Sequence, residues 1–235
     1  MLNYFITFDP MAIGRLMIRI TIIALLSLTS ITMKAQQSMA PNKYLALGDS
    51  YTIGESVAER DRWPNQLVDS LHRHGMEFSK PTIIATTGWR TDDLKKAVTA
   101  AHLKNEYGLV SLLIGVNNQY QGKPADQYSV EFEDLLETAT RLAGGKKENV
   151  LVVSIPDYGY PPFGKSRQSI ISSAINEFNA INKRITEGHG IKYVNITDVS
   201  RSGLEQPALV APDGLHPSGK MYALWVECIV KSLVH

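Results

Sequence analysis

The chain has 235 residues, of which 44% are hydrophobic and 20% are charged, a composition that fits one globular domain with a sizeable core. Its formal net charge of +1, without a long basic run, gives no electrostatic reason to expect nucleic acid as a partner. The single cysteine, Cys228, excludes an intrachain disulfide and a cysteine-rich metal site, and its apolar surroundings indicate a packed core thiol.

The first predicted element is a secretory signal peptide. Residues 18–33 are apolar apart from hydroxyl side chains and Arg19, and they follow Arg15. This apolar stretch is short for a membrane span, which needs roughly 20 residues. We therefore expect a signal peptide over residues 1–35, cleavage after Ala35, and a mature domain over residues 36–235 that is periplasmic or extracellular, with no stable membrane insertion. The alternative is an uncleaved membrane anchor.

From Asn42 onward, five short apolar runs alternate with segments of helical periodicity. The runs are apolar at nearly consecutive positions, which is typical of strands buried on both faces of a parallel sheet. The predicted strands are residues 43–48, 81–86, 108–115, 149–155 and 191–196. The predicted helices are residues 63–74, 91–103, 125–143, 167–187 and 218–235.

This alternation predicts an α/β fold, a doubly wound three-layer α/β/α sandwich. Parallel strands need crossover connections, and helices must cover both faces of such a sheet. Ligands bind outside the carboxyl ends of the strands in sheets of this kind. The residues that follow each predicted strand are therefore the expected place for a functional site.

Residues suited to chemistry follow the predicted strands at that edge. The segments after the five strands are residues 48–50, 86–91, 115–120, 156–164 and 211–219. His72 and His74 lie near the end of a predicted helix without further ligands, which argues against a metal there, and we expect neither a metal nor another cofactor.

The combination of these segments predicts acyl-transfer chemistry. Ser50 stands at a strand-to-helix turn, where a serine serves either as a helix N-cap or as a nucleophile. Among the six histidines, His216 alone lies in a loop at this edge, and Asp213 can hold its Nδ1–H so that Nε2 faces the serine. The backbone N–H groups of Ser50 and Gly88 and the side-chain amide of Asn117 are the candidate oxyanion donors.

These residues resemble a known family. The stretches "GDSYTIGE", the Gly88 block, "GVNN" and "DGLHP" occur in the order of the four blocks of the SGNH, or GDSL, hydrolases, and the resemblance runs from Tyr44 to the C-terminus. It implies a flavodoxin-like sandwich with a five-stranded parallel sheet. It also implies a serine esterase whose name-giving residues are Ser50, Gly88, Asn117 and His216, with Asp213 completing the triad.

Two positions depart from the family pattern. The third block usually reads Gly-x-Asn-Asp, but Asn118 replaces the acid here and removes a carboxylate that could brace the loop. The first block has Tyr51 where leucine is usual, a difference outside the chemistry.

Further side chains in the edge loops have two open interpretations each. Aromatic residues there could line a pocket for an acyl or sugar group, or pack as ordinary loop residues; they are Trp89, Tyr120, Tyr158, Tyr160 and Phe163. Arg90 could meet an anionic substrate group or stay solvated. Asp157 could contact substrate or serve as a turn residue.

The leading functional hypothesis is a cofactor-free serine esterase that forms an acyl-enzyme intermediate. The expected partners are small-molecule or glycan esters with short acyl chains, such as acetylated carbohydrate or small lipid esters, because the chain lacks long insertions that would deepen the site. The alternatives are an inactive carbohydrate-binding member, an acyltransferase and a flavin-binding flavodoxin-like protein. The last is disfavoured because its Thr/Gly loop, residues 86–91, follows the second strand rather than the first.

Overall fold

The structure is a computed structural model that describes residues 41–234. The predicted signal peptide, its cleavage site and the first residues of the predicted mature domain lie outside the described residues.

Five parallel strands form one sheet in the order β2-β1-β3-β4-β5. The strands are β1 (Tyr44–Gly48), β2 (Thr82–Ala85), β3 (Leu109–Leu113), β4 (Val150–Val153) and β5 (Lys192–Val194). Strand β1 lies between β2 and β3, so that Leu45 is paired with Thr82 on one side and Val110 on the other. The strands that follow β1 are therefore added first on one side of it and then on the other. This is the flavodoxin-like strand order, and it confirms the predicted fold class.

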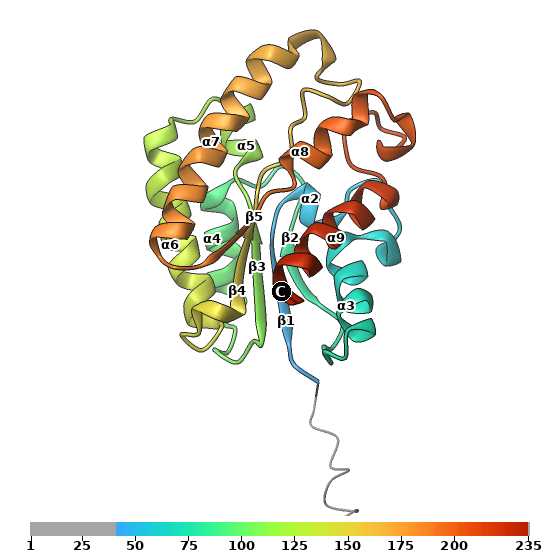
Figure 1. The fold of residues 1–235 in the computed structure, drawn as a ribbon. Coiled ribbons are helices and arrows are strands. Elements are labelled where there is room, and N and C mark those ends of the chain that lie inside the picture. Colours follow the sequence, from blue (N-terminus) through green and yellow to red (C-terminus); the bar gives the residue numbers. More distant parts are fainter. Residues whose placement is uncertain (1–40, 235) are drawn as a thin grey trace, which may run out of the picture. The chain divides into compact units, whose positions relative to one another are not determined.

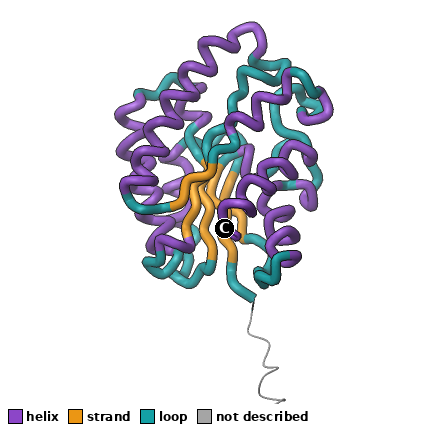
Figure 2. The backbone as a smooth tube through the Cα atoms, viewed as in Figure 1, coloured by secondary structure: helices purple, strands orange, loops and turns teal. Residues whose placement is uncertain are grey.

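The helices cover both faces of this sheet (Figures 1 and 2). One layer holds α3 (Trp63–Arg73) and α9 (Gly219–Val234), which pack against each other. The other holds α4 (Thr91–Ala100), α6 (Ala125–Leu142) and α7 (Gln168–Gly188). These five long helices lie within a few residues of their predicted bounds.

Three short helices were not predicted as separate elements. They are α2 (Ser50–Ile53), α5 (Val116–Tyr120) and α8 (Thr197–Ser200). Each begins within three residues of the end of a strand, namely β1, β3 and β5. They therefore lie at the edge of the sheet where the functional residues were expected.

The core is centred on the three inner strands, β1, β3 and β4, in which every residue is buried. The prediction that all five strands are buried on both faces is wrong for β2 and β5, where Thr82 and Lys192 are exposed. An edge strand has a neighbouring strand on one side only, so part of it stays open to solvent. The edge strands accordingly begin with polar residues, whereas the inner strands do not.

Candidate active site

Ser50 begins helix α2 directly after β1, and the turn between them requires a glycine. A Cβ at Gly48 would lie 2.2 Å from Thr52 Oγ1 and 2.6 Å from the Leu113 carbonyl oxygen, so a larger residue would collide with α2 and β3. Asp49 is the N-cap, because its side chain accepts a hydrogen bond from the Tyr51 N–H at 3.1 Å. The capping role considered for Ser50 is thus filled by its neighbour.

Asp213 and His216 lie in the loop before α9 and contact each other. His216 Nδ1 is 2.7 Å from Asp213 Oδ2, and the N–H groups of Leu215 and His216 each donate to Asp213 Oδ1 at 2.9 Å. The loop is closed by a 2.8 Å hydrogen bond from the Ala211 N–H to the His216 carbonyl. The predicted fold-back of Asp213 onto His216 is therefore present in the geometry.

The charge on Asp213 is stabilised by these contacts. Burial acts to raise the pKa of this carboxyl, but hydrogen bonds from the Ser56 hydroxyl, from two backbone N–H groups and from His216 lower the pKa well below its ordinary value. A carboxylate that remains ionised beside Nδ1 keeps the proton on that nitrogen, which leaves Nε2 as the acceptor. The tautomer suited to a general base follows from this arrangement.

Ser50 and His216 line one cleft of about 250 Å³ together with Gly88 and Asn117. Ser50 and His216 are buried, and the His216 ring packs edge-on against Tyr51 with the ring centroids 5.6 Å apart. Between residues 41 and 234, no hydrogen bond joins the Ser50 hydroxyl to His216. The residues predicted from four separate blocks are therefore brought to one cleft, with Asp213 behind the histidine.

The candidate oxyanion donors have free hydrogens in this cleft. Within the described part of the chain, the backbone N–H groups of Ser50 and Gly88 have no hydrogen-bond acceptor. Gly88 has a φ of 85°, a left-handed conformation that suits glycine. Asn117 Nδ2 donates one hydrogen to the Trp89 carbonyl at 2.9 Å, and its amide carries a second hydrogen. Two backbone N–H groups and one amide hydrogen are thus available as donors among the residues that line this cleft.

Asn118 braces the site at the position where the family usually has an acid. Its side chain is buried; Oδ1 accepts from the Thr91 N–H at 3.1 Å and Nδ2 donates to Thr91 Oγ1 at 2.6 Å. The Thr91 hydroxyl in turn donates to the Glu131 carboxylate on α6. The loop therefore keeps a brace formed by an amide, and the carboxylate of the network comes from another helix.

Three of the five candidate aromatic residues line the cleft: Tyr120, Tyr158 and Phe163. Their ring centroids are 5.9 to 6.5 Å apart in pairs, which is the usual range for aromatic contacts. Tyr120 and Phe163 are 53% and 45% exposed, whereas Tyr158 is buried and donates to Gln119 Oε1 at 2.8 Å. We call these three residues the aromatic wall; it has one fixed member and two exposed ones.

The other edge residues are engaged elsewhere. Tyr160 lies under the Arg201 guanidinium, 5.8 Å from the ring centroid, and Trp89 packs against the core. Arg90 donates to Asp92 and to Gln121, so its guanidinium is hydrogen-bonded within the protein. The Asp157 carboxylate accepts from the Gly159 N–H, as expected for a turn residue, and also pairs with Arg201 at 3.1 Å.

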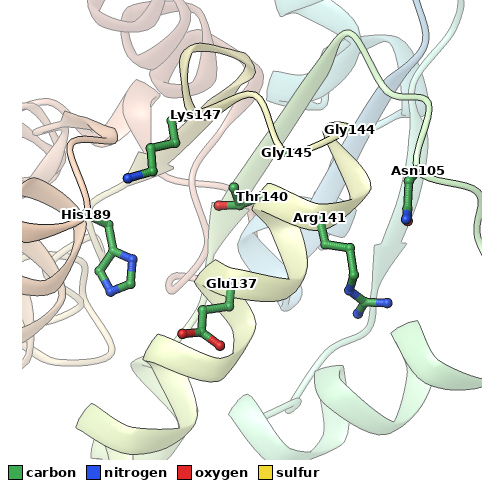
Figure 3. Close-up of a pocket in the computed structure, with 8 residues that line it drawn as sticks. All are labelled: Asn105, Glu137, Thr140, Arg141, Gly144, Gly145, Lys147 and His189. Atoms are coloured by element: carbon green, nitrogen blue, oxygen red, sulfur yellow. The ribbon is translucent and has the colours of Figure 1, made fainter.

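A larger cavity, of about 660 Å³, lies at the opposite edge of the sheet (Figure 3). Its lining residues precede the strands: Asn105 comes before β3, Lys147 before β4 and His189 before β5. Figure 3 shows Glu137, Thr140 and Arg141 on α6 beside it. The Thr140 hydroxyl donates to the Leu136 carbonyl of its own helix.

Residues 41–234 contain no group of side chains that could hold a metal ion. None of the helices over the same range is long and apolar enough to cross a membrane.

The sequence profile of the GDSL-like Lipase/Acylhydrolase family matches residues 46–224. The chain belongs to this family. The predicted resemblance is therefore confirmed, and this GDSL-like hydrolase is a carboxylic ester hydrolase. The curated proteins include no significant sequence match to it.

Solved structures of low sequence identity share the fold of this GDSL-like hydrolase. The psychrotrophic esterase EstA from Pseudoalteromonas sp. is 18% identical, with a TM-score of 0.62 over 82% of this chain and 97% of the other. The acetylxylan esterase Axe2 from Geobacillus stearothermophilus is 17% identical, with a TM-score of 0.65 over 83% of this chain and 94% of the other. TesA is 18% identical, with a TM-score of 0.63 over 81% of this chain and 97% of the other.

Three residues that contact the site were not singled out from the sequence of the GDSL-like hydrolase. The sequence does carry a signal for Thr91, because it stands at the start of a predicted helix, where hydroxyl side chains often hydrogen-bond to nearby groups. Ser56 and Glu131 carry no such signal. The contact of Ser56 depends on an unusual backbone angle, and the contact of Glu131 depends on the packing of α6 beside α4.

Proposed function

We propose that this GDSL-like hydrolase is a serine esterase in which Ser50 is the nucleophile, His216 the general base and Asp213 the residue that orients the imidazole. The observation that carries the proposal is the cleft that Ser50 and His216 line together with Gly88 and Asn117, the candidate oxyanion donors of the second and third blocks. A nucleophile, a base in the correct tautomer and an oxyanion site are the parts that acyl transfer needs.

The first half of the reaction transfers the acyl group to the enzyme. His216 Nε2 accepts the Ser50 proton while Oγ bonds to the ester carbonyl carbon, and the carbonyl electron pair moves onto oxygen. The N–H groups of Ser50 and Gly88 and the Asn117 amide donate to this oxyanion. The carbonyl then re-forms, the bond to the alcohol breaks, and the alcohol leaves with the proton held by His216.

The second half releases the acid. A water molecule gives a proton to His216 and attacks the acyl carbon, and collapse of the second oxyanion breaks the bond to Ser50 Oγ, which regains a proton from His216. Because catalytic hydrogen bonds are often long before substrate binds, the unjoined Ser50 and His216 fit this sequence of steps.

We propose short-chain acyl esters of a ring-bearing alcohol, such as an acetylated carbohydrate, as the preferred substrates. The cleft of about 250 Å³ is smaller than the cavities of roughly 300 to 1,000 Å³ that enclose drug-sized ligands. The exposed faces of Tyr120 and Phe163 can pack against the apolar face of a sugar ring. The name of Axe2, an acetylxylan esterase of the same fold, agrees with this choice.

The test measures hydrolysis of p-nitrophenyl esters from acetate to palmitate and of acetylated xylooligosaccharides, by the wild type and by Ser50→Ala. We expect the highest kcat/KM on acetate, acetate release from the oligosaccharides, and loss of both activities in the variant. Covalent labelling by a fluorophosphonate should depend on Ser50. Full activity of Ser50→Ala would refute the nucleophile, and a maximum at long acyl chains would refute the substrate class.

We also propose that the protein is exported after cleavage behind Ala35. The apolar stretch of residues 18–33 after Arg15 supports this proposal. N-terminal sequencing of the protein recovered outside the cytoplasm would show a start at residue 36, and recovery of the uncleaved chain in the membrane fraction would refute cleavage.

A further inference from the structure

The segment that follows the nucleophile helix contacts the loops on both sides of it. The Ser56 hydroxyl donates to Asp213 Oδ2 at 2.6 Å, and the Thr87 hydroxyl donates to the Glu55 carboxylate. Thr87 lies directly before Gly88 in the chain, and Asp213 lies three residues before His216. Two consecutive side chains thus connect the α2 segment to the oxyanion loop and to the loop that carries the base.

An unusual backbone places these side chains. Gly54 ends α2 with a φ of 71°, and Ser56 has a φ of 65°. A residue with a Cβ is strained in this left-handed region, whereas glycine is not. Among the described residues, only Ser56 and His102 carry a side chain at positive φ. A glycine would be less strained at position 56, so what the serine adds is its hydroxyl.

The contacts of Asp213 show what this hydroxyl contributes. Oδ1 accepts from the N–H groups of Leu215 and His216, and Oδ2 accepts from His216 Nδ1 and from Ser56. Three of these four donors belong to the Asp213 loop itself. In the part of the chain that the structure describes, Ser56 is the only donor to Asp213 from outside that loop.

We propose that Ser56 is a positioning residue, which ties Asp213, and through it His216, to the segment that carries Ser50. The proposal rests on the proposed function, since it assigns Ser56 a part in the same triad. Asp213 is 30% exposed, so water can replace the lost hydrogen bond when the hydroxyl is removed. A water molecule, unlike Ser56, is not attached to the α2 segment and cannot hold Asp213 in place relative to it. Removal of the hydroxyl should therefore disturb the orientation of His216 and lower kcat, with little effect on KM.

The experiment compares Ser56→Gly and Ser56→Ala with wild type on p-nitrophenyl acetate. Both variants lack the hydroxyl, but only glycine relaxes the left-handed backbone. We expect kcat to fall about fivefold to tenfold in both, as for one oriented hydrogen bond, with KM nearly unchanged. The matched control is His102→Gly, the other left-handed position, which lies at the far edge of the sheet and should keep the wild-type kcat.

A double-mutant cycle tests whether Ser56 acts through Asp213. In an Asp213→Ala background, Ser56→Gly should cause no further loss, because the group it orients is gone. A Ser56→Gly variant with wild-type kcat would overturn the proposal, and so would an equal loss in both backgrounds.

A spectroscopic readout separates this proposal from the proposed function. The proton NMR signal of the His216 Nδ1–H, assigned by its loss in His216→Gln, should move in Ser56→Gly even if the substrate class is wrong. An unchanged signal would overturn the role of Ser56. Retained activity of Ser50→Ala would instead overturn the serine mechanism and leave the NMR result to decide on Ser56.

Discussion

The Asn118 side-chain amide lies 2.6 Å from the Thr91 hydroxyl, and this buried contact joins α5 to the start of α4. The amide donates to Thr91 Oγ1, so the single hydroxyl hydrogen is left for the Glu131 carboxylate. Asn117, the neighbour of Asn118, carries a candidate oxyanion donor. A chain of hydrogen bonds therefore runs from α6 to the sequence neighbour of a candidate oxyanion donor.

Replacement of Thr91 by valine should disturb both the fold and the oxyanion site. Thr91→Val leaves the buried Asn118 amide without its acceptor, which should lower the free energy of unfolding by about 1 to 3 kcal/mol. We expect kcat to fall with it, because Asn117 loses its support. Chemical denaturation and p-nitrophenyl acetate kinetics measure the two effects. Thr99→Val, at an exposed position of the same helix, is the control and should change stability by less than about 0.5 kcal/mol.

Removal of the Asn117 amide should reduce turnover while leaving substrate binding nearly intact. Asn117→Ala removes one proposed oxyanion donor, and the loss of such a donor typically costs about 100- to 1,000-fold in kcat. Steady-state kinetics on p-nitrophenyl acetate would measure the loss, with a thermal melt to confirm folding. Asn105→Ala, beside the cavity at the opposite edge, is the matched control. A loss below about threefold in Asn117→Ala would remove this residue from the oxyanion site.

The aromatic wall should distinguish substrates by their alcohol. Replacing both Tyr120 and Phe163 by alanine should lower kcat/KM for an acetylated xylooligosaccharide relative to p-nitrophenyl acetate about tenfold, as expected for lost aromatic contacts. The exposed Val130→Ala should leave this ratio unchanged. A constant ratio in the double variant would show that the wall does not contact the leaving alcohol.

The buried Asp49 should make stability depend on pH in a defined direction. Burial raises the pKa of this carboxyl from 3.8 to about 7, against the smaller effect of a hydrogen bond from the Tyr51 N–H. Between these two values the folded protein binds more protons than the unfolded chain, so the free energy of unfolding falls as the pH rises and becomes constant above about 7.

Asp49→Asn should abolish that dependence, because the amide needs no proton and its oxygen can still accept from Tyr51. Denaturation between pH 4 and 9 should show the variant more stable than wild type by about 1 to 3 kcal/mol at neutral pH. Asp69→Asn, an exposed position on α3, serves as the control. A wild-type curve that rises over this range would contradict the assignment.

Much of this architecture could be predicted because it depends on local patterns. Runs such as Val150–Val153 are apolar throughout and indicated inner strands, and the four family blocks located the cleft residues. The brace formed by Glu131 could not be predicted, since a charged residue on a helix surface gives no sign of the partner that packing brings to it. Ser56 was missed for a related reason: its partner, Asp213, lies 157 residues further along the chain.

The separation of the site residues along the chain has a consequence for biosynthesis. Ser50 follows the first strand, whereas Asp213 and His216 follow the last one. A growing chain therefore holds its candidate nucleophile long before the candidate base has been synthesised, and α9, which follows that base, can pack against α3 only when the chain is nearly complete. We therefore expect esterase activity to appear during refolding together with the burial of Trp63 and Trp225, because these residues lie on α3 and α9.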